Sequence, residues 1–174
     1  MRRWTEKDVG PFAEMNADPM VMRFFPSVLS LEESGAIYQK IQSQFDERGY
    51  GLWAIEVDGA FAGFTGLNET KFETTIGPHI EIGWRLARWS WGQGYATEAA
   101  NAAAKVGFEA HGLLEIFSFT TRTNVRSEAV MRRIGMHRRA DLDFDHPNTP
   151  GWWGQDHIVY QLTAQQWGES VGDR

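Results

Sequence analysis

Apolar and polar residues alternate most strictly along residues 79–87. One set of alternate positions is large and apolar, and it consists of Ile80, Ile82, Trp84 and Leu86. The positions between them carry a carboxylate, no side chain and a guanidinium, and they are Glu81, Gly83 and Arg85. Because successive side chains of a strand point to opposite faces, this pattern predicts a strand with one apolar and one polar face.

The remaining pattern predicts an ordered series of strands and helices. Strands are expected at residues 50–57, 60–67, 115–121, 136–144 and 157–162, with Asp58-Gly59 as a tight hairpin turn between the first two. Helices are expected at residues 6–18, 31–48, 94–110 and 124–134, with a short helical turn near residues 20–24. Thr5 and Ser30 are the expected caps of the first two helices. Helices first, then a meander, then strand–helix–strand–helix–strand predict one mixed-sheet α/β domain over residues 1–174.

Composition excludes several classes of function. The chain has 174 residues and no cysteine, which rules out disulfides, thiolate metal sites and a cysteine nucleophile. The histidines show no metal-ligand spacing, so we expect no metal. A net charge of −6 disfavours nucleic acid, whose binding needs clustered Lys and Arg, and is compatible with a cationic substrate such as an amine. No apolar run approaches the roughly 18 residues of a membrane helix and no signal region precedes the fold, so we expect a cytoplasmic protein without a membrane partner.

The stretch WSWGQGYATEAA, residues 89–100, places two glycines between the polar-faced strand and an alanine-rich helix. It lacks the third glycine of a dinucleotide fingerprint, because Thr97 stands there, and it lacks the Gly-Lys-Ser/Thr of a nucleotide hydrolase. Free N–H groups at a helix start, approached closely because glycine has no side chain, suit a pyrophosphate that is held but not cleaved. The alternative is a plain strand-to-helix turn.

Two longer stretches resemble a known family. EIGWRLARWSWGQGYATEAA is similar to the acetyl-CoA-binding motif of the GNAT superfamily, the GCN5-related N-acetyltransferases. TRTNVRSEAVMRRIGM resembles the branch of RimJ/RimL-type ribosomal-protein N-terminal acetyltransferases, with Asn124, Ser127, Met131, Gly135 and Met136 matching that branch's pattern. The resemblance covers residues 2–162 and implies a mostly antiparallel central sheet that is splayed at the cofactor strand and flanked by helices.

The sequence departs from the family in two places. Trp89 occupies the first position of the glycine loop, where the family usually has Gln or Arg. Family members also carry a full first strand before the segment Arg2-Arg3-Trp4, whereas this sequence begins at Met1. A truncated or misassigned start is therefore one expectation.

The resemblance implies a site for acetyl-CoA, the expected cosubstrate. The residues expected to bind it are Trp84, Arg85, Leu86, Gly92, Gln93, Gly94, Tyr95, Ala96, Thr97, Asn124 and Met131. Ser127 is expected to donate a hydrogen bond to the departing thiolate. Many family members have a tyrosine acid at the position of Met131, and methionine cannot replace it in that role.

The catalytic base is either Glu81 or His146, or the proton leaves through water. Glu81 takes the strand position at which several family members carry a catalytic glutamate, and its alternative is an ion pair with Arg85 on the same strand face. His146, whose ordinary pKa of about 6.5 lies near the working range, is otherwise a loop residue that stabilises the turn before Pro147. Trp152 and Trp153 line a substrate pocket or cover the end of the sheet.

The resemblance implies direct transfer of acetyl to a primary amine of a protein N-terminus or a small molecule, without a covalent enzyme intermediate. The alternative is a non-catalytic acyl-CoA-binding or sensor module of the same fold. A Rossmann-like nucleotide binder is disfavoured by Thr97 and by the lack of an acidic residue ending the next strand. We expect a monomer or a homodimer.

Overall fold

The computed structural model describes residues 1–172, which fold in the order that the sequence pattern predicts. The strands are β1 (Leu52–Val57), β2 (Ala60–Glu69), β3 (Ile80–Leu86), β4 (Glu115–Thr121), β5 (His137–Arg138), β6 (Phe144–Asp145) and β7 (Asp156–Thr163). The helices are α1 (Val9–Ala17), α2 (Leu31–Arg48), α3 (Tyr95–Lys105), α4 (Val125–Arg133) and α5 (Ala164–Gly172). Residues 173 and 174, which end the predicted domain of residues 1–174, lie outside the described residues.

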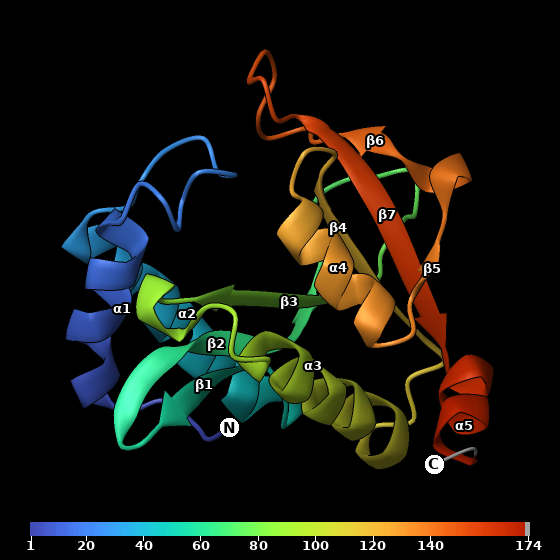
Figure 1. Cartoon of the computed structure of the whole chain (residues 1–174), viewed down its shortest axis with the longest axis horizontal. Helices are drawn as coiled ribbons and strands as arrows, with labels where there is room; N and C mark the ends of the chain where they lie inside the picture. The colour runs from blue at the N-terminus through green and yellow to red at the C-terminus, as the bar shows by residue number, and fades with distance from the viewer. Residues whose placement is uncertain (173–174) are drawn as a thin grey trace.

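The strands form one sheet in the order β1-β2-β3-β4-β7-β5, and β6 pairs with the start of β7. Neighbouring strands are antiparallel except β3 and β4, which run parallel and share only the pairing of Glu81 with Phe117. Figure 1 shows these two strands diverging from that point. The predicted mixed, mostly antiparallel sheet, splayed between β3 and its parallel neighbour and flanked by helices, is confirmed.

Two apolar clusters hold helices against opposite faces of the sheet (Figure 1). On one face α3 and α4 pack over Leu67 and Ile82, and on the other face α1 and α2 pack over Ala54 and Phe64. Phe64 is the register partner of Arg85, and side chains of paired residues share a face. The polar face predicted for β3 is therefore the face covered by α1 and α2.

Local signals fix the ends of several elements. Ser30 and Glu33 form a reciprocal capping box at the start of α2, and Gly49 ends that helix in the left-handed conformation with φ of 76°. Asp58 and Gly59 have positive φ values of 49° and 80°, as the predicted tight hairpin between β1 and β2 requires. The N-terminal segment bridges β1 through Arg2.

The structure differs from the predicted elements in two places. The short helical turn predicted near residues 20–24 is not one of them, because the N–H of Met22 donates to the carbonyl of Asp18 at 3.0 Å, the hydrogen bond of a single helical turn. The strand predicted at residues 136–144 is divided into β5 and β6 by a 3-10 turn at Ala140–Leu142. At this point the N–H of Val159 in β7 donates to the side chain of Asp143, in place of a backbone carbonyl of a continuous neighbouring strand. Helix α5 was not predicted.

Candidate active site

The turn that leads into α3 presents uncapped backbone donors. Gly92 and Gly94 have φ angles of 77° and 86°, which glycine adopts without strain. Gly94 is the N-cap of α3, and among the described residues no side chain caps the N–H groups at this end. A Cβ atom at either glycine would meet no other atom within 4 Å. Open backbone, free N–H groups and the positive end of the helix dipole together suit a bulky anion such as a pyrophosphate.

The cofactor-binding residues predicted in this turn lie together. Residues 92–94 are exposed, and residues 95–97 form the half-buried first turn of α3. Beside them Trp91 donates a hydrogen bond from Nε1 to the carbonyl of Leu86 at 2.8 Å. The guanidinium of Arg126 lies 4.9 Å from the ring of Trp91. These contacts bring the end of β3 and the first turn of α4 to the glycine turn.

The second part of β3 has one unpaired edge. The strand pairs with β2 along its whole length but with β4 only at Glu81. Within residues 1–172, residues 82–86 therefore have no strand on their other side. The backbone of Trp84, Arg85 and Leu86 could pair there with an extended ligand, as the resemblance implies. Their side chains separate, because Trp84 and Leu86 pack toward α3 while Arg85 lies on the opposite face.

Helix α4 carries the three other predicted cofactor-contacting residues in different environments. Asn124 is the N-cap: its Oδ1 accepts from the N–H of Ser127 at 3.3 Å, and its Nδ2 donates to Oγ1 of Thr120 at 3.0 Å. Ser127 is half-buried, and its hydroxyl makes no hydrogen bond with residues 1–172. Met131 is fully buried in the core beside α3. The structure thus gives Asn124 a capping role and Met131 a packing role, and their contact with a cofactor stays a prediction.

Glu81 is a desolvated carboxyl on the polar face of β3. Burial raises the pKa of Glu81 to about 8. The ion pair with Arg85, the structural alternative for this residue, is not formed, because Nη1 of Arg85 instead donates to Oδ1 of Asn16 at 2.7 Å. Oε1 of Glu81 lies 3.7 Å from the place where a Cβ of Gly83 would stand. A carboxyl with a pKa near neutrality and no ionic partner in the described chain can exchange a proton.

His146 lies on the same face of the sheet, inside an aromatic cluster. Its ring centroid is 4.5 Å from that of Phe72, 6.2 Å from that of Phe119 and 5.1 Å from that of His157. Its Nδ1 accepts from the N–H of Asn148 at 3.3 Å. Burial, with the charge of His157, lowers the pKa of His146, so the ring is neutral at and above pH 7. It is available as a base, but its packing resembles that of a structural residue.

Two loops meet over this face. The segment between α1 and α2 and the loop between β6 and β7 rise on the same side of the molecule in Figure 1. The ring of Phe24 from the first lies 6.2 Å from the ring of Trp153 from the second. Trp153 is 62% exposed, whereas Trp152 is half-buried and packs over Gly154. Their placement above the face that carries Glu81 fits the predicted wall of an acceptor pocket.

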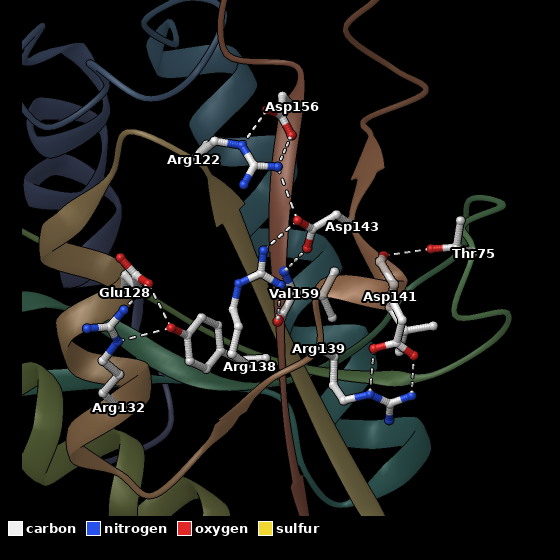
Figure 2. Close-up of polar contacts among 12 residues, drawn as sticks. Thr75, Arg122, Glu128, Arg132, Arg138, Arg139, Asp141, Asp143, Asp156 and Val159 are labelled. Atoms are coloured by element: carbon white, nitrogen blue, oxygen red, sulfur yellow. Dashed lines mark hydrogen bonds and ion pairs between the residues drawn. The ribbon is translucent and has the colours of Figure 1, made fainter.

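A network of ion pairs braces the β4–α4 turn against β7 (Figure 2). Asp143 accepts hydrogen bonds from Arg138, from the N–H of Val159 and from Arg122. Arg122 also pairs with Asp156 of β7 at 2.6 Å. Burial alone would raise the pKa of Asp143, but these hydrogen bonds outweigh it and lower that pKa. The network fixes Arg122, which follows the end of β4 and lies two residues before Asn124.

A second contact in Figure 2 anchors the middle of α4. The hydroxyl of Tyr160 donates to Oε1 of Glu128 at 2.7 Å, and Nε of Arg132 donates to that hydroxyl at 3.0 Å. Tyr160 is 2% exposed, so Glu128 and Arg132 satisfy the hydroxyl of an otherwise buried side chain. The contact holds α4 on β7 and sets the position of Ser127, which adjoins Glu128.

Sequence comparison decides the family. The profile described as "Acetyltransferase (GNAT) domain" matches residues 1–137, more than three quarters of the chain. The chain belongs to the GNAT acetyltransferase family. It is an acyl-CoA N-acyltransferase that acts with acetyl-CoA, in agreement with the glycine turn and the splayed strands.

Curated relatives of this GNAT chain are distant. The FsC-acetyl coenzyme A-N(2)-transacetylase of Aspergillus fumigatus is 29% identical over 126 residues, 68% of this chain and 52% of the fungal protein. The chain thus spans about half the length of that relative. The uncharacterized N-acetyltransferase YnaD of Bacillus subtilis is 26% identical over 96% of this chain and 94% of its own length. The uncharacterized protein YkkB of the same organism is 32% identical over 83% of this chain and 79% of its own.

Solved GNAT structures share the fold. An acetyltransferase (GNAT family) from Bacillus anthracis superposes with a TM-score of 0.75 at 25% identity, over 94% of this chain and 93% of that one. RimJ of Mycobacterium smegmatis, in complex with CoA-disulfide, gives a TM-score of 0.75 at 19% identity, over 99% of this chain and 87% of that one. At that identity the likeness concerns the fold alone, so membership of the RimJ/RimL branch is not established.

Two features are absent from the part of the chain that the structure describes. No helix within residues 1–172 is long and apolar enough to cross a bilayer. The same residues contain no group of three His, Asp or Glu side chains placed to hold a metal ion.

Proposed function

We propose that this acetyltransferase acts on a primary amine, of a protein N-terminus or of a small molecule, by direct transfer without a covalent enzyme intermediate. When bound, acetyl-CoA supplies an activated thioester. The observation that carries the proposal is Glu81, a desolvated carboxyl with a pKa of about 8 that stands where β3 and β4 diverge. A group with that pKa is partly ionised at neutral pH, and after accepting a proton it readily releases that proton to solvent and becomes a carboxylate again.

Binding of the cosubstrate would rest on backbone groups. The N–H groups of residues 93–96 would hold the pyrophosphate, which is supported by the uncapped start of α3. The free edge of residues 84–86 would pair with the extended pantetheine, and an N–H near Trp84 would polarise the thioester carbonyl. One hydrogen of Asn124 Nδ2 is donated to Thr120, so the second would be the one that reaches the pantetheine, while Oδ1 caps the first turn of α4.

Proton transfer would involve two side chains. Glu81 would accept the proton of the amine, directly or through water, and His146 remains the second candidate for this role. The hydroxyl of Ser127, which has no partner within residues 1–172, would donate to the departing sulfur. Such a hydrogen bond strengthens as charge builds on the sulfur and therefore acts on kcat.

The acceptor is an amine that is easily neutralised. An N-terminal amine has an ordinary pKa of about 7.7–8.0, so removing its proton at pH 7 costs about 1 kcal/mol, whereas a lysine costs about 4–5 kcal/mol. A base with a pKa of about 8 matches the first and not the second. This match favours N-terminal or other weakly basic amines, the acceptor class of the RimJ/RimL branch.

The test is release of CoA thiol from acetyl-CoA in the presence of a panel of amines. Peptides with a free N-terminus should release thiol in proportion to acetylated peptide, and the same peptides blocked at the N-terminus but carrying lysine should not. Tight binding of acetyl-CoA without thiol release from any amine would instead support the non-catalytic module, which no observation favours at present.

A further inference from the structure

Arg85 is a cation inside the fold without an anionic partner. Its only hydrogen bond within residues 1–172 runs from Nη1 to Oδ1 of Asn16 at 2.7 Å. Its guanidinium carbon lies 4.2 Å from the ring centroid of Phe25 and 5.5 Å from that of Phe64. Burial lowers the pKa of Arg85 to about 10, which leaves it charged at neutral pH. A desolvated charge that lacks a counter-ion destabilises the folded chain.

The edge of this guanidinium that fits a carboxylate is free. Nε of Arg85 has no exposed surface and no hydrogen-bond partner, and Nη2 donates to no residue within 1–172. The N–H bonds of Nε and Nη2 are parallel and match the two oxygens of a carboxylate. Because Asn16 occupies only Nη1, it fixes the guanidinium and leaves that pair of donors unused. Asn16 is itself held, since its Nδ2 donates to Oγ of Ser34 at 3.0 Å and none of its surface is exposed.

Arg85 shares its strand face with the proposed base. Glu81, Gly83 and Arg85 follow one another at every second position of β3, and the glycine leaves the face bare between the two charged groups. Oε1 of Glu81 reaches to 3.7 Å from the Cβ position of Gly83. Gly83 and Arg85 are two residues of extended strand apart, so their Cβ positions are separated by about 7 Å.

We propose that the Nε–Nη2 edge of Arg85 binds a carboxylate of the acceptor, so that the acceptor carries a carboxylate within one or two residues of its reacting amine. The inference rests on the proposed function, in which the reacting amine lies beside Glu81. A dipeptide, whose amine and C-terminal carboxylate are separated by two residues, has this chemistry. A peptide whose second residue is acidic offers the same chemistry from a side chain.

Access to this edge is through Phe25. The ring covers the guanidinium but is itself 39% exposed, and it belongs to a segment between α1 and α2 that contains no helix or strand. A carboxylate that engages both donors displaces this ring and keeps the bond to Asn16.

The first experiment compares matched acceptors. Alanylalanine and its C-terminal amide have similar amines and differ in the carboxylate; a longer amidated peptide with glutamate or glutamine as second residue separates a side-chain source from a C-terminal one. Wild-type protein should show a KM roughly 10- to 100-fold lower for the carboxylate member of at least one pair, as a charged bidentate hydrogen bond predicts. Equal KM values within both pairs would overturn the proposal.

Variants separate recognition from a structural role. In Arg85→Met the preference should disappear, so that the two acceptors of a pair have equal KM values, and Arg85→Lys should keep part of the preference because the charge remains. Asn16→Asp supplies the guanidinium with an internal carboxylate and should also abolish the preference. Arg133→Met, the loss of an exposed arginine of α4, is the control for net charge. If Arg85→Met raises the KM of both acceptors equally, the proposal is overturned, and Arg85 only supports the segment between α1 and α2 through its contact with Phe25.

A binding measurement needs no turnover. Calorimetric titration with the product, N-acetyl-alanylalanine, in the presence of CoA should give a Kd roughly 10- to 100-fold higher for Arg85→Met than for wild type. Equal Kd values overturn the carboxylate site. If wild type acetylates no amine, the proposed function fails, and this titration alone decides on Arg85.

Discussion

The most informative perturbation is Glu81→Gln, because it removes the ionisable group and keeps the shape of the side chain. With a pKa of about 8, roughly a tenth of Glu81 is ionised at pH 7 and roughly a hundredth at pH 6. Loss of a positioned base lowers the rate by roughly 10²–10⁴-fold when the base is fully ionised. The ratio of the wild-type rate to the Glu81→Gln rate should therefore reach that full value above pH 9. It should be about tenfold smaller at pH 7 and about a hundredfold smaller at pH 6.

The assay is kcat/KM for one acceptor between pH 6 and 9.5, measured by thiol release. The acceptor amine ionises identically with both proteins, so the ratio of wild type to Glu81→Gln cancels its contribution. This ratio should rise with pH and level off above about pH 8. The matching ratio for His146→Ala should be flat above pH 7, because the lowered pKa of His146 leaves that ring neutral there.

Three results would refute the reasoning. A wild-type to Glu81→Gln ratio that does not change with pH would show that Glu81 is not the base. A limb below pH 6.5 that vanishes in His146→Ala would assign the role to His146. Near-normal rates in both variants would mean that the proton leaves through ordered water.

Stability gives an independent check on the pKa of Glu81. Burial raises this pKa above that of the unfolded chain, about 4.5, so the folded state binds more protons between pH 4.5 and 8. The contribution of Glu81 to stability is therefore full below pH 4.5 and is lost as pH rises through about 8. At about 1.4 kcal/mol per pKa unit, Glu81→Gln should be more stable than wild type at pH 9 by at most about 5 kcal/mol. The same difference in denaturation midpoint between Glu81→Gln and wild type at pH 5 and at pH 9 would contradict this.

Three further predictions concern the cofactor end and the brace of α4. Gly94→Val should weaken acetyl-CoA binding by at least about tenfold in calorimetry, whereas Gly112→Val, equally strained at φ of 62° and far from the turn, should lose similar stability and keep the affinity; equal affinities of all three proteins would disprove this placement. Ser127→Ala should lower kcat roughly tenfold or more with little change in the KM of acetyl-CoA, and a pure KM effect would assign Ser127 to binding. The pKa of Asp143 is lowered in the fold, so its contribution to stability is present above about pH 3.8 and is lost as pH falls through its folded pKa. The free energy of unfolding should therefore fall less steeply with decreasing pH in Asp143→Asn than in wild type. An equal pH dependence in the two proteins would argue against the network in Figure 2.

Elements with a strong periodic pattern could be predicted from the sequence, because their side chains face one apolar layer. The strand of residues 79–87 and the capped helix after Ser30 are of this kind. The start of helix α5 also has a signal in the sequence: Thr163 and Gln166 accept hydrogen bonds from each other's N–H groups, the Thr-x-x-Gln form of a capping box. The division of β5 from β6 could not be predicted, since it depends on Asp143 replacing a ladder carbonyl of a strand distant in sequence.

The candidate site divides in the same way. The glycine turn could be predicted because its chemistry is local backbone, and Glu81 because it stands on a regular strand. The environment of Arg85 could not, because Asn16 and Phe25 come from elements about 60–70 residues away and no spacing relates them. Nor could the sequence show that Asn124 donates one Nδ2 hydrogen to Thr120, because only the turn between β4 and α4 brings the two side chains within reach.

The central claim is that this chain transfers acetyl from acetyl-CoA to an amine held beside Glu81. Its most direct test is the stoichiometry of thiol release against acetylated acceptor, the latter counted by mass spectrometry with a peptide of free N-terminus. Wild type should give one thiol per acetylated peptide, no release without the peptide, and a rate at pH 9 at least about a hundredfold above that of Glu81→Gln. Thiol release that is independent of the amine, or equal in the two proteins, would contradict the claim.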